Sequence, residues 1–370
     1  MIKFISRTIT ISAILCSVCF VTYKFYDATT IEDTSTKNVK QNNNMLSMML
    51  ETEAGSGQYE MTTSSSWSTD GYVFNGELSK CENGSALSWD DTNKQVVMEG
   101  NVSDKCYVYF DVYNPTLAEY VASQYTGTQG ENNIYYHDSN LTNGAGDNSY
   151  RYAGASADVK NYICLGSDAE TCPEDNLYRI IGVFGDNNHG IKDQQLVKVI
   201  KNTSYGKYAW NTTKSNDWSS ASLNETLNTT FKTEKLSGLE DKIAEVSWKV
   251  GGVSYSPTTA KSYYAEEITS ATKTYDAKVG LMYLSDYGFA TTPDYWTTNL
   301  NSYDSNSNAY QKDWLYLGST EWLLSPYSRS TDSAWDVYSS GLVSYGNYVT
   351  STHTVRSSFY LLSSVNFVGG

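Results

Sequence analysis

The stretch “EWLLSPYSRSTDSAWDVYSSGLVSYGNYVTSTHTVRSSFYLL”, from Glu321 to Leu362, is dense in Tyr, Trp, Ser and Gly. It contains one His and no Cys. Short runs that suit strands alternate with Ser- and Gly-rich breaks, which predicts irregular β structure. Tyr and Trp among Ser and Gly are also typical of adaptable recognition surfaces, because they give rigid contact area at a small entropic cost. Packing and binding are therefore the two alternative uses of these aromatic residues.

Length and composition set the outer limits. A chain of 370 residues suggests two or three folded units. A hydrophobic fraction of 40% is enough to build packed cores, so the chain is not disordered as a whole. The formal net charge of −15 argues against a nucleic-acid partner, whose phosphates the protein would repel.

The N-terminal sequence “MIKFISRTITISAILCSVCFVTYKFYDATT” predicts export. Lys3 and Arg7 precede an apolar run that is near the shortest length able to cross a bilayer. Positive charges before a span stay in the cytoplasm. We therefore expect a cytoplasmic end over residues 1–7, a signal anchor or transmembrane helix over 8–26, and an extracellular folded part. The predicted location is the cell membrane, crossed once.

Two alternatives to an uncleaved anchor stay open at this point. A cleaved secretory signal needs small residues before the cut, and no Ala-x-Ala pattern follows the apolar run. A lipid anchor would use Cys16 or Cys19, but Leu15 and Val18 stand where a small residue is expected. All three alternatives export the rest of the chain.

Four cysteines lie beyond this segment, and they fall into two pairs. Cys81 lies near Cys106, and Cys164 lies near Cys172. An even number in an oxidising compartment predicts one disulfide bond within each pair. Buried free thiols are the alternative. A four-ligand zinc site fits poorly, because neither pair has the short Cys-x-x-Cys spacing.

The rest of the chain divides into three segments. Residues 27–55 lack a strand pattern and are rich in Thr, Asn and acidic residues, so we expect a spacer, with a short helix over “MLSMMLE” (45–51). Residues 56–113 alternate apolar and polar positions, which predicts a β module stapled by the first disulfide. Residues 114–370 mix helical and strand patterns, and we expect an α+β domain there.

Within the last segment, several elements have clear patterns. A helix is expected in “PTLAEYVASQY” (115–125) and another in “WSSASLNETLNTTF” (218–231). Strands are expected in “NLYRIIGVFG” (176–185) and “QLVKVIKN” (195–202). In “KVGLMYLSDYGFA” (278–290) we expect a strand that breaks into a turn at Ser285-Asp286.

Motifs that carry chemistry are missing from the sequence. His137, His189 and His353 are scattered and have no metal-binding spacing. The acidic run “DAETCPED” (168–175) has the composition of a calcium loop but not its spacing. We predict no catalytic residue, no metal site and no cofactor. A hydrolase whose paired carboxylates meet only in space is an alternative that sequence cannot place.

Four blocks near the C-terminus carry a resemblance: “KVGLMYLSDYGFA”, “WLYLGSTEWLLSPYS”, “AWDVYSSGLVSY” and “VRSSFYLLSSV”. Together they resemble the C-terminal domain of many predicted surface proteins of gut Firmicutes. That domain is distantly similar to the C-type-lectin-like fold shared with formylglycine-generating enzymes. The resemblance covers most of residues 114–370 and implies a C-type-lectin-like α+β domain.

The resemblance also implies roles for single residues. The residues matching its blocks are expected to be scaffold, with Arg356 pairing inward: Trp322, Ser325, Pro326, Val337, Gly341, Val355, Arg356 and Leu361. Ser357 departs from the pattern, which has Pro there and so restrains the backbone more tightly. The resembling oxidases need late cysteines, and none follows Cys172, so oxidase chemistry does not carry over. The resembling domains often continue for one more strand beyond “NFVGG”, so a longer native chain is one alternative.

Binding without catalysis is then the leading interpretation. The candidate ligand contacts lie between the scaffold blocks: Tyr327, Arg329, Trp335, Tyr338, Tyr345 and Tyr348. Packing of the same residues is the alternative, and Trp335 is the more core-like because it shares a strand face with Val337. We expect a membrane-anchored, adhesin-like surface protein that binds a glycan or a protein on a host or neighbouring cell. An exported hydrolase and a structural surface component without a ligand are the rivals.

Overall fold

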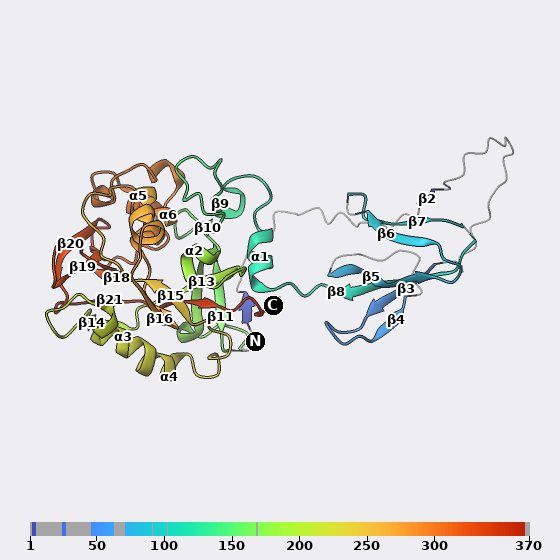
Figure 1. The fold of residues 1–370 in the computed structure, drawn as a ribbon, viewed down its shortest axis with the longest axis horizontal. Coiled ribbons are helices and arrows are strands. Elements are labelled where there is room, and N and C mark those ends of the chain that lie inside the picture. Colours follow the sequence, from blue (N-terminus) through green and yellow to red (C-terminus); the bar gives the residue numbers. More distant parts are fainter. Residues whose placement is uncertain are drawn as a thin grey trace. The chain divides into compact units, whose positions relative to one another are not determined.

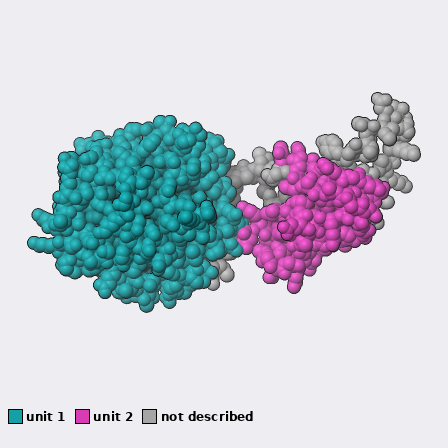
Figure 2. Space-filling view, viewed as in Figure 1, with its two compact units in different colours: residues 1–8, 115–370 teal, residues 9–114 magenta. Residues whose placement is uncertain are grey.

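The computed structural model describes residues 46–62, 71–90, 92–101, 103–167 and 169–366, together with the backbone of 2–4 and 24–26. The chain divides into two compact units, shown in different colours in Figure 2. Unit 1 comprises residues 1–8 and 115–370, and unit 2 comprises residues 9–114. The architecture is mixed α+β, as the sequence predicts.

Unit 2 is built from two small sheets (Figure 1). One has the strand order β4-β3-β8-β5, in which β3 runs parallel to β8. The other has the order β2-β7-β6, in which β6 and β7 pair as antiparallel neighbours. The strands are β2 (Lys24–Tyr26), β3 (Leu46–Glu51), β4 (Tyr59–Met61), β5 (Tyr72–Cys81), β6 (Ala86–Asp90), β7 (Gln95–Glu99) and β8 (Cys106–Val112).

The core of unit 2 is small. Val108 and Phe110 of β8 are buried in it together with Met48 and Val96. Trp89 packs against Phe110 with 5.5 Å between ring centroids. The disulfide between Cys81 and Cys106 joins directly opposite residues of β5 and β8, so it fixes the register of that strand pair. This bond confirms the first predicted pairing.

The prediction of a short helix over residues 45–51 is wrong for its described part, because Leu46–Glu51 is strand β3. It lies between β4 and β8, so both of its edges have hydrogen-bonding partners. The carboxylate of Glu51 also accepts hydrogen bonds from Gly57 N and Val112 N, at 3.0 Å each. These contacts come from distant segments and override a weak local preference. The β module therefore begins before Ser56.

Most of the predicted anchor, residues 8–23, lies outside the described residues. Its last three residues differ from the prediction, because 24–26 form strand β2 beside β7. Residues 2–4 form strand β1 (Ile2–Phe4), which pairs with a strand of unit 1. No helix among the described residues combines the length and the apolar content needed to cross a bilayer.

Unit 1 contains a large sheet with the order β1-β11-β12-β13-β22-β17, beside which β10 pairs with both β12 and β9. The predicted strands at 176–185 and 195–202 are its neighbours β12 and β13. The late strand β22 pairs with β13 on one side and β17 on the other. The bounds are β9 (Ile134–Tyr136), β10 (Tyr150–Tyr152), β11 (Tyr162–Leu165), β12 (Leu177–Phe184), β13 (Leu196–Lys201), β17 (Val279–Gly280) and β22 (Ser358–Leu361).

A second sheet of unit 1 is formed mainly by the stretch from Glu321 onward. Its order is β14-β21-β18-β19-β20, and β18 runs parallel to β21. A separate hairpin pairs β15 with β16. The strands are β14 (Gly206–Ala209), β15 (Val246–Lys249), β16 (Thr274–Ala277), β18 (Glu321–Pro326), β19 (Ser333–Val337), β20 (Val343–Tyr348) and β21 (Thr352–Val355).

The helices are short. Those predicted at 115–125 and 218–231 form, and Figure 1 shows α5 and α6 side by side. The α-helices are α1 (Leu117–Ser123), α2 (Asp186–His189), α3 (Ser222–Thr226), α4 (Lys232–Lys235), α5 (Ala260–Tyr264) and α6 (Leu284–Ala290). The π-helical turns are η4 (Leu227–Phe231) and η5 (Ala265–Thr269). The 3-10 turns are η1 (Glu131–Asn133), η2 (Glu174–Asn176), η3 (Trp218–Ser220), η6 (Pro293–Tyr295), η7 (Leu300–Ser302) and η8 (Ala309–Lys312).

Helix α6 corrects the turn that was predicted at Ser285-Asp286. Its first N–H groups are satisfied by buried carboxylates, which is what a helix start needs. Glu267 accepts from Leu284 N at 3.2 Å and from Ser285 N at 2.6 Å. Asp286 accepts from Tyr283 N at 2.8 Å. The Asp286 contact is local to the helix start, but Glu267 comes from a segment that sequence alone could not place beside α6.

Every tryptophan of residues 115–370 is buried. Six of these seven indoles donate their N–H to a main-chain carbonyl, three of them over more than a hundred residues of sequence: Trp210 to Leu323, Trp322 to Tyr208 and Trp314 to Tyr152. The others are Trp248 to Ala277, Trp296 to Thr291 and Trp335 to Val253. The indoles of unit 1 thus fill the core and also join segments that are far apart in the sequence.

The second predicted disulfide, Cys164–Cys172, is also present, and the two bonds allow a matched test. The first closes 25 residues and the second 8, so loop entropy gives about 3.5 and about 2.5 kcal/mol of stabilisation. We expect replacement of Cys81 and Cys106 by Ala to lower the calorimetric transition of unit 2 and leave that of unit 1 unchanged. The Cys164/Cys172 double variant should do the reverse, and a shift of the same transition by both variants would contradict the division into units.

Candidate functional site

The residues expected to be scaffold are buried. Trp322, Val355 and Leu361 lie in the core of unit 1. Gly341 has a positive φ of 97°, and a Cβ there would lie 2.3 Å from Tyr310 Cβ, so only glycine fits. The hairpin that joins β19 to β20 can therefore pack closely against the segment around Tyr310.

Arg356 pairs inward. Its Nε and Nη2 atoms donate to the two carboxylate oxygens of Glu321, each at 2.8 Å, and Nη2 also donates to Leu315 O at 2.6 Å. The two-fold geometry and the extra carbonyl satisfy most of a buried guanidinium. This contact ties the start of β18 to the end of β21, so Arg356 holds the second sheet together.

The six candidate ligand contacts differ in how much of each side chain is exposed. Trp335 is 0% exposed, whereas Tyr345 is 38%, Tyr338 45% and Tyr348 62% exposed. Tyr327 is partly buried and Arg329 is exposed. Trp335 therefore cannot touch a ligand directly, and the prediction that it is a ligand contact is wrong. The reason is that all five residues of β19 are buried, so both faces of this strand are covered by other parts of unit 1.

Four side chains form a continuous surface, which we call the tyrosine patch: Tyr255, Tyr327, Arg329 and Tyr345. The Tyr345 ring lies 4.7 Å from Tyr327 and 6.3 Å from Tyr255, between ring centroids. The Arg329 guanidinium lies 4.2 Å from the centroid of Tyr255. Its Nη1 also donates to the Tyr255 hydroxyl at 3.0 Å. The patch combines aromatic faces with one cation.

Trp335 supports this patch from below. Its ring lies 5.3 Å from Tyr345 and 6.0 Å from Tyr327. Its indole N–H donates to Val253 O at 3.1 Å, which fixes the loop that carries Tyr255. Val253 N donates in turn to Pro326 O at 2.9 Å. The buried indole thus positions rings from both the late stretch and the loop around Tyr255.

Tyr255 is not among the predicted contacts, because it lies about seventy residues before Tyr327 in the sequence. It stands in “VSYSP”, and the only local signal was an aromatic residue between two serines. Tyr338 and Tyr348, in contrast, take part in none of the ring contacts found among the described residues. The patch therefore brings together three of the six predicted contacts and adds a fourth residue.

His353 and Asp336 form the nearest approach to a catalytic pair. His353 Nε2 lies 3.7 Å from Asp336 Oδ2, and the imidazole lies 4.3 Å from the Trp322 ring. Burial lowers the pKa of His353 and raises the pKa of Asp336 to about 7. The imidazole is therefore neutral at pH 7, so the contact is not a full ion pair. This pair has none of the hydrogen-bonded alignment that a base and its orienting acid need.

A second group of charges is fully buried between β10, β13 and α6. Lys198 Nζ lies 2.6 Å from Asp286, and Arg151 lies 2.7 Å from Asp147. Glu267 is nearby, and burial raises its pKa to about 7. These groups satisfy one another and the first turn of α6. They stabilise the core of unit 1.

One group of potential metal ligands occurs in the described part of the chain: Cys81, Asp104 and Cys106. Both sulfurs are consumed by the disulfide. The Asp104 carboxylate accepts from Asn83 N at 2.8 Å and from Ser85 N at 3.1 Å, which closes the turn beside it. The group is structural and offers no free ligand set.

The chain was compared with protein families, curated proteins and solved structures. No protein-family model, no curated protein and no solved structure matches the chain.

The buried position of Trp335 makes a direct prediction. We expect Trp335→Ala to lower the free energy of unfolding by about 3–5 kcal/mol, as for other large buried aromatics. Tyr338→Ala should change it by less than about 0.5 kcal/mol, because Tyr338 is exposed and outside the ring contacts. Denaturant unfolding of the two variants and the parent measures both. An early-melting Tyr338→Ala variant would show that this ring is part of the core.

The raised pKa of Asp336 predicts that the free energy of unfolding depends on pH. Its folded pKa of about 7 lies above the ordinary value of 3.8, so the folded state keeps the proton longer than the unfolded state. The contribution of Asp336 to stability is therefore full below about pH 4 and is lost as pH rises through 7. Asp336→Asn removes this loss, and the difference in unfolding free energy between variant and parent should rise across pH 4–7, by up to about 4 kcal/mol. A constant difference in parallel denaturation curves would contradict the raised pKa.

Proposed function

We propose that this protein is a membrane-anchored, adhesin-like surface protein whose folded units lie outside the cell and bind a partner protein through the tyrosine patch. The two disulfides support an oxidising, extracellular setting. The basic start and the apolar run after it support anchoring near residues 8–26. Anchoring with residues 1–7 inside requires that residues 2–4 leave their pairing with β11. The resemblance to surface proteins with a C-type-lectin-like domain is consistent with this proposal.

The tyrosine patch is the observation that carries the proposal. Tyr and Arg are enriched at the centres of protein interfaces, where each supplies a large contact and a polar end. Here their rings are already held by one another and by Trp335, so little order has to be gained on binding. Arg329 offers a cation on a protein with a net charge of −15, which favours a partner with a carboxylate opposite it.

The rival functions receive less support. A hydrolase needs an accessible carboxylate with a suitable pKa, but the acids whose pKa values burial raises are enclosed in the core: Glu267, Asp313, Glu321 and Asp336. A purely structural component predicts a uniformly polar face, and the tyrosine patch does not fit that description. Neither rival has an observation of its own in its favour.

Cell adhesion tests the proposal. Cells displaying the full chain are tested for binding to host epithelial cells and to neighbouring bacterial cells, with a Tyr255→Ala/Arg329→Ala variant and a Tyr348→Ala control from β20. Loss of central contacts typically costs about 2 kcal/mol or more in binding, which is about thirtyfold. We expect this loss for the double variant only, at equal surface display.

Two controls make this outcome decisive. Protease treatment of intact cells should remove both folded units and abolish adhesion, because the proposal places them outside. Thermal unfolding of the double variant should match that of the parent, because Arg329 and Tyr255 are exposed. Unchanged adhesion of the double variant, or equal loss with Tyr348→Ala, would overturn the role of the patch.

A further inference from the structure

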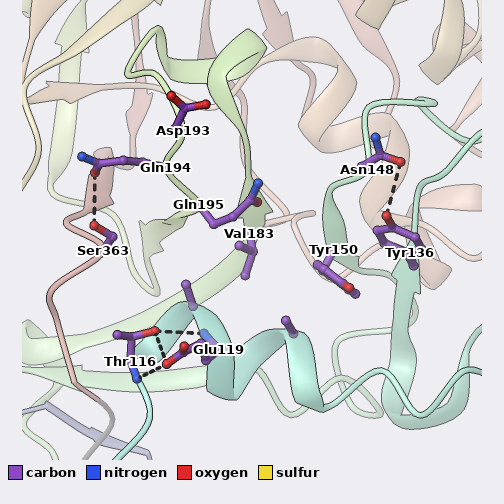
Figure 3. A pocket seen from close by; sticks show the side chains of 12 residues that line it. Thr116, Glu119, Tyr136, Asn148, Tyr150, Val183, Asp193, Gln194, Gln195 and Ser363 are labelled. Atoms are coloured by element: carbon purple, nitrogen blue, oxygen red, sulfur yellow. Dashed lines mark hydrogen bonds between the residues drawn. The ribbon is translucent and has the colours of Figure 1, made fainter.

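A second surface feature lies away from the tyrosine patch, on the side of unit 1 where α1 packs. It is a groove of about 530 Å³, within the size range of small-ligand sites. Figure 3 shows α1 along one side, with Val183 of β12, Gln195 and Tyr150 facing it. The floor is apolar, because Ala118 and Ala122 of α1 and Val183 line it. The groove thus has an apolar floor that polar side chains surround.

Tyrosines build one end of the groove. The Tyr136 and Tyr150 rings are stacked at 4.6 Å between centroids, and Tyr125 lies 5.8 Å and 5.9 Å from them. Strand β10 can approach β12 closely enough to carry Tyr150 there because position 182 is glycine. A Cβ on Gly182 would lie 2.1 Å from Tyr150 O. The ring wall is therefore set by backbone packing and is in place without a ligand.

The polar groups around the floor have unused hydrogen-bonding capacity. Asn148 Oδ1 accepts from the Tyr136 hydroxyl at 3.3 Å, and Gln194 Oε1 accepts from Ser363 Oγ at 3.1 Å. These contacts orient the two amides and leave their NH₂ groups without a partner in the described protein. The amide of Gln195 and the hydroxyl of Tyr150 likewise have no partner there. Several donors consequently border the same apolar floor.

The charged residues that line the groove restrict the class of ligand that it can bind. No Lys or Arg is among the described residues that line the groove, whereas two carboxylates are. One of these, Glu119, is already engaged, accepting from Thr116 N at 2.8 Å and from Thr116 Oγ1 at 2.9 Å. The other, Asp193, is exposed. An anion would meet only negative charge, and a purely apolar molecule would strip water from the amides without replacing its hydrogen bonds.

We propose that this groove binds one sugar ring of an uncharged glycan. A pyranose has an apolar C–H face that fits the alanines, Val183 and the Tyr150 ring, and a rim of hydroxyls that accept from amide N–H groups and donate to Asp193. The site is separate from the tyrosine patch and does not depend on the protein partner proposed for it.

The test uses the full chain in detergent and the methyl glycosides of glucose, galactose, mannose and N-acetylglucosamine, with sialic acid and galactose 6-sulfate as anionic comparisons. Binding is measured by ligand-observed NMR. Ala122→Trp fills the groove from a partly exposed position of α1 that lines it, and Gln195→Ala removes one amide. Gln311→Ala removes a surface amide elsewhere and is the matched control.

We expect at least one neutral glycoside to bind the parent and the Gln311→Ala variant with a millimolar Kd. Gln195→Ala should weaken it up to about tenfold, as for the loss of one hydrogen bond, and Ala122→Trp should abolish binding. Calorimetry must give both groove variants the parent's melting temperature for this reading to stand. Arg329→Ala should leave sugar binding unchanged, so failure of this site is distinguishable from failure of the tyrosine patch.

Three results would overturn the proposal. The first is that no neutral glycoside binds the parent at about 10 mM, a concentration above the millimolar Kd that we expect. The second is binding that survives Ala122→Trp. The third is equal or tighter binding of the anionic sugars, which would mean that the groove selects for charge in spite of its carboxylates.

Discussion

The indole-to-carbonyl hydrogen bonds are the constraint on which unit 1 depends. Segments far apart in the sequence meet in its core, and the buried carbonyls there need hydrogen-bond donors. A tryptophan fills a large volume and also brings one N–H. Each such bond contributes only about 1 kcal/mol net, but an orphaned carbonyl would cost more. Trp335 shows the result most clearly, because one indole holds Val253 and supports two surface rings.

Buried charges also join separate segments of unit 1. Arg356 joins Glu321 to Leu315 O, and Lys198 joins β13 to Asp286 at the start of α6. Buried ion pairs contribute little net stability compared with apolar packing, but they strongly disfavour arrangements in which one partner is missing. In a unit with short helices and interrupted strands, such pairs select one arrangement from many compact ones.

What sequence could predict follows from the range of the interactions involved. Patterns decided locally or by spacing, such as β12, β13, α1 and both disulfides, were predictable. Strand β3 and helix α6 were not, because their hydrogen-bonding partners come from β8 and from Glu267. The late stretch indicated aromatic recognition, and three of its residues do form the patch. Tyr255 and the groove depend on segments that meet only in the folded chain.

The position of β22 has a consequence for biosynthesis. This strand lies inside the large sheet, between β13 and β17, although β13 precedes it by more than 150 residues. Synthesis runs from the N-terminus to the C-terminus. Unit 2 can therefore fold while the edge of β13 in unit 1 still lacks its partner strand β22. Contacts this distant in sequence also form slowly. Unit 1 therefore acquires its final packing only after β22 has been synthesised, whereas the packing of unit 2 does not depend on that strand.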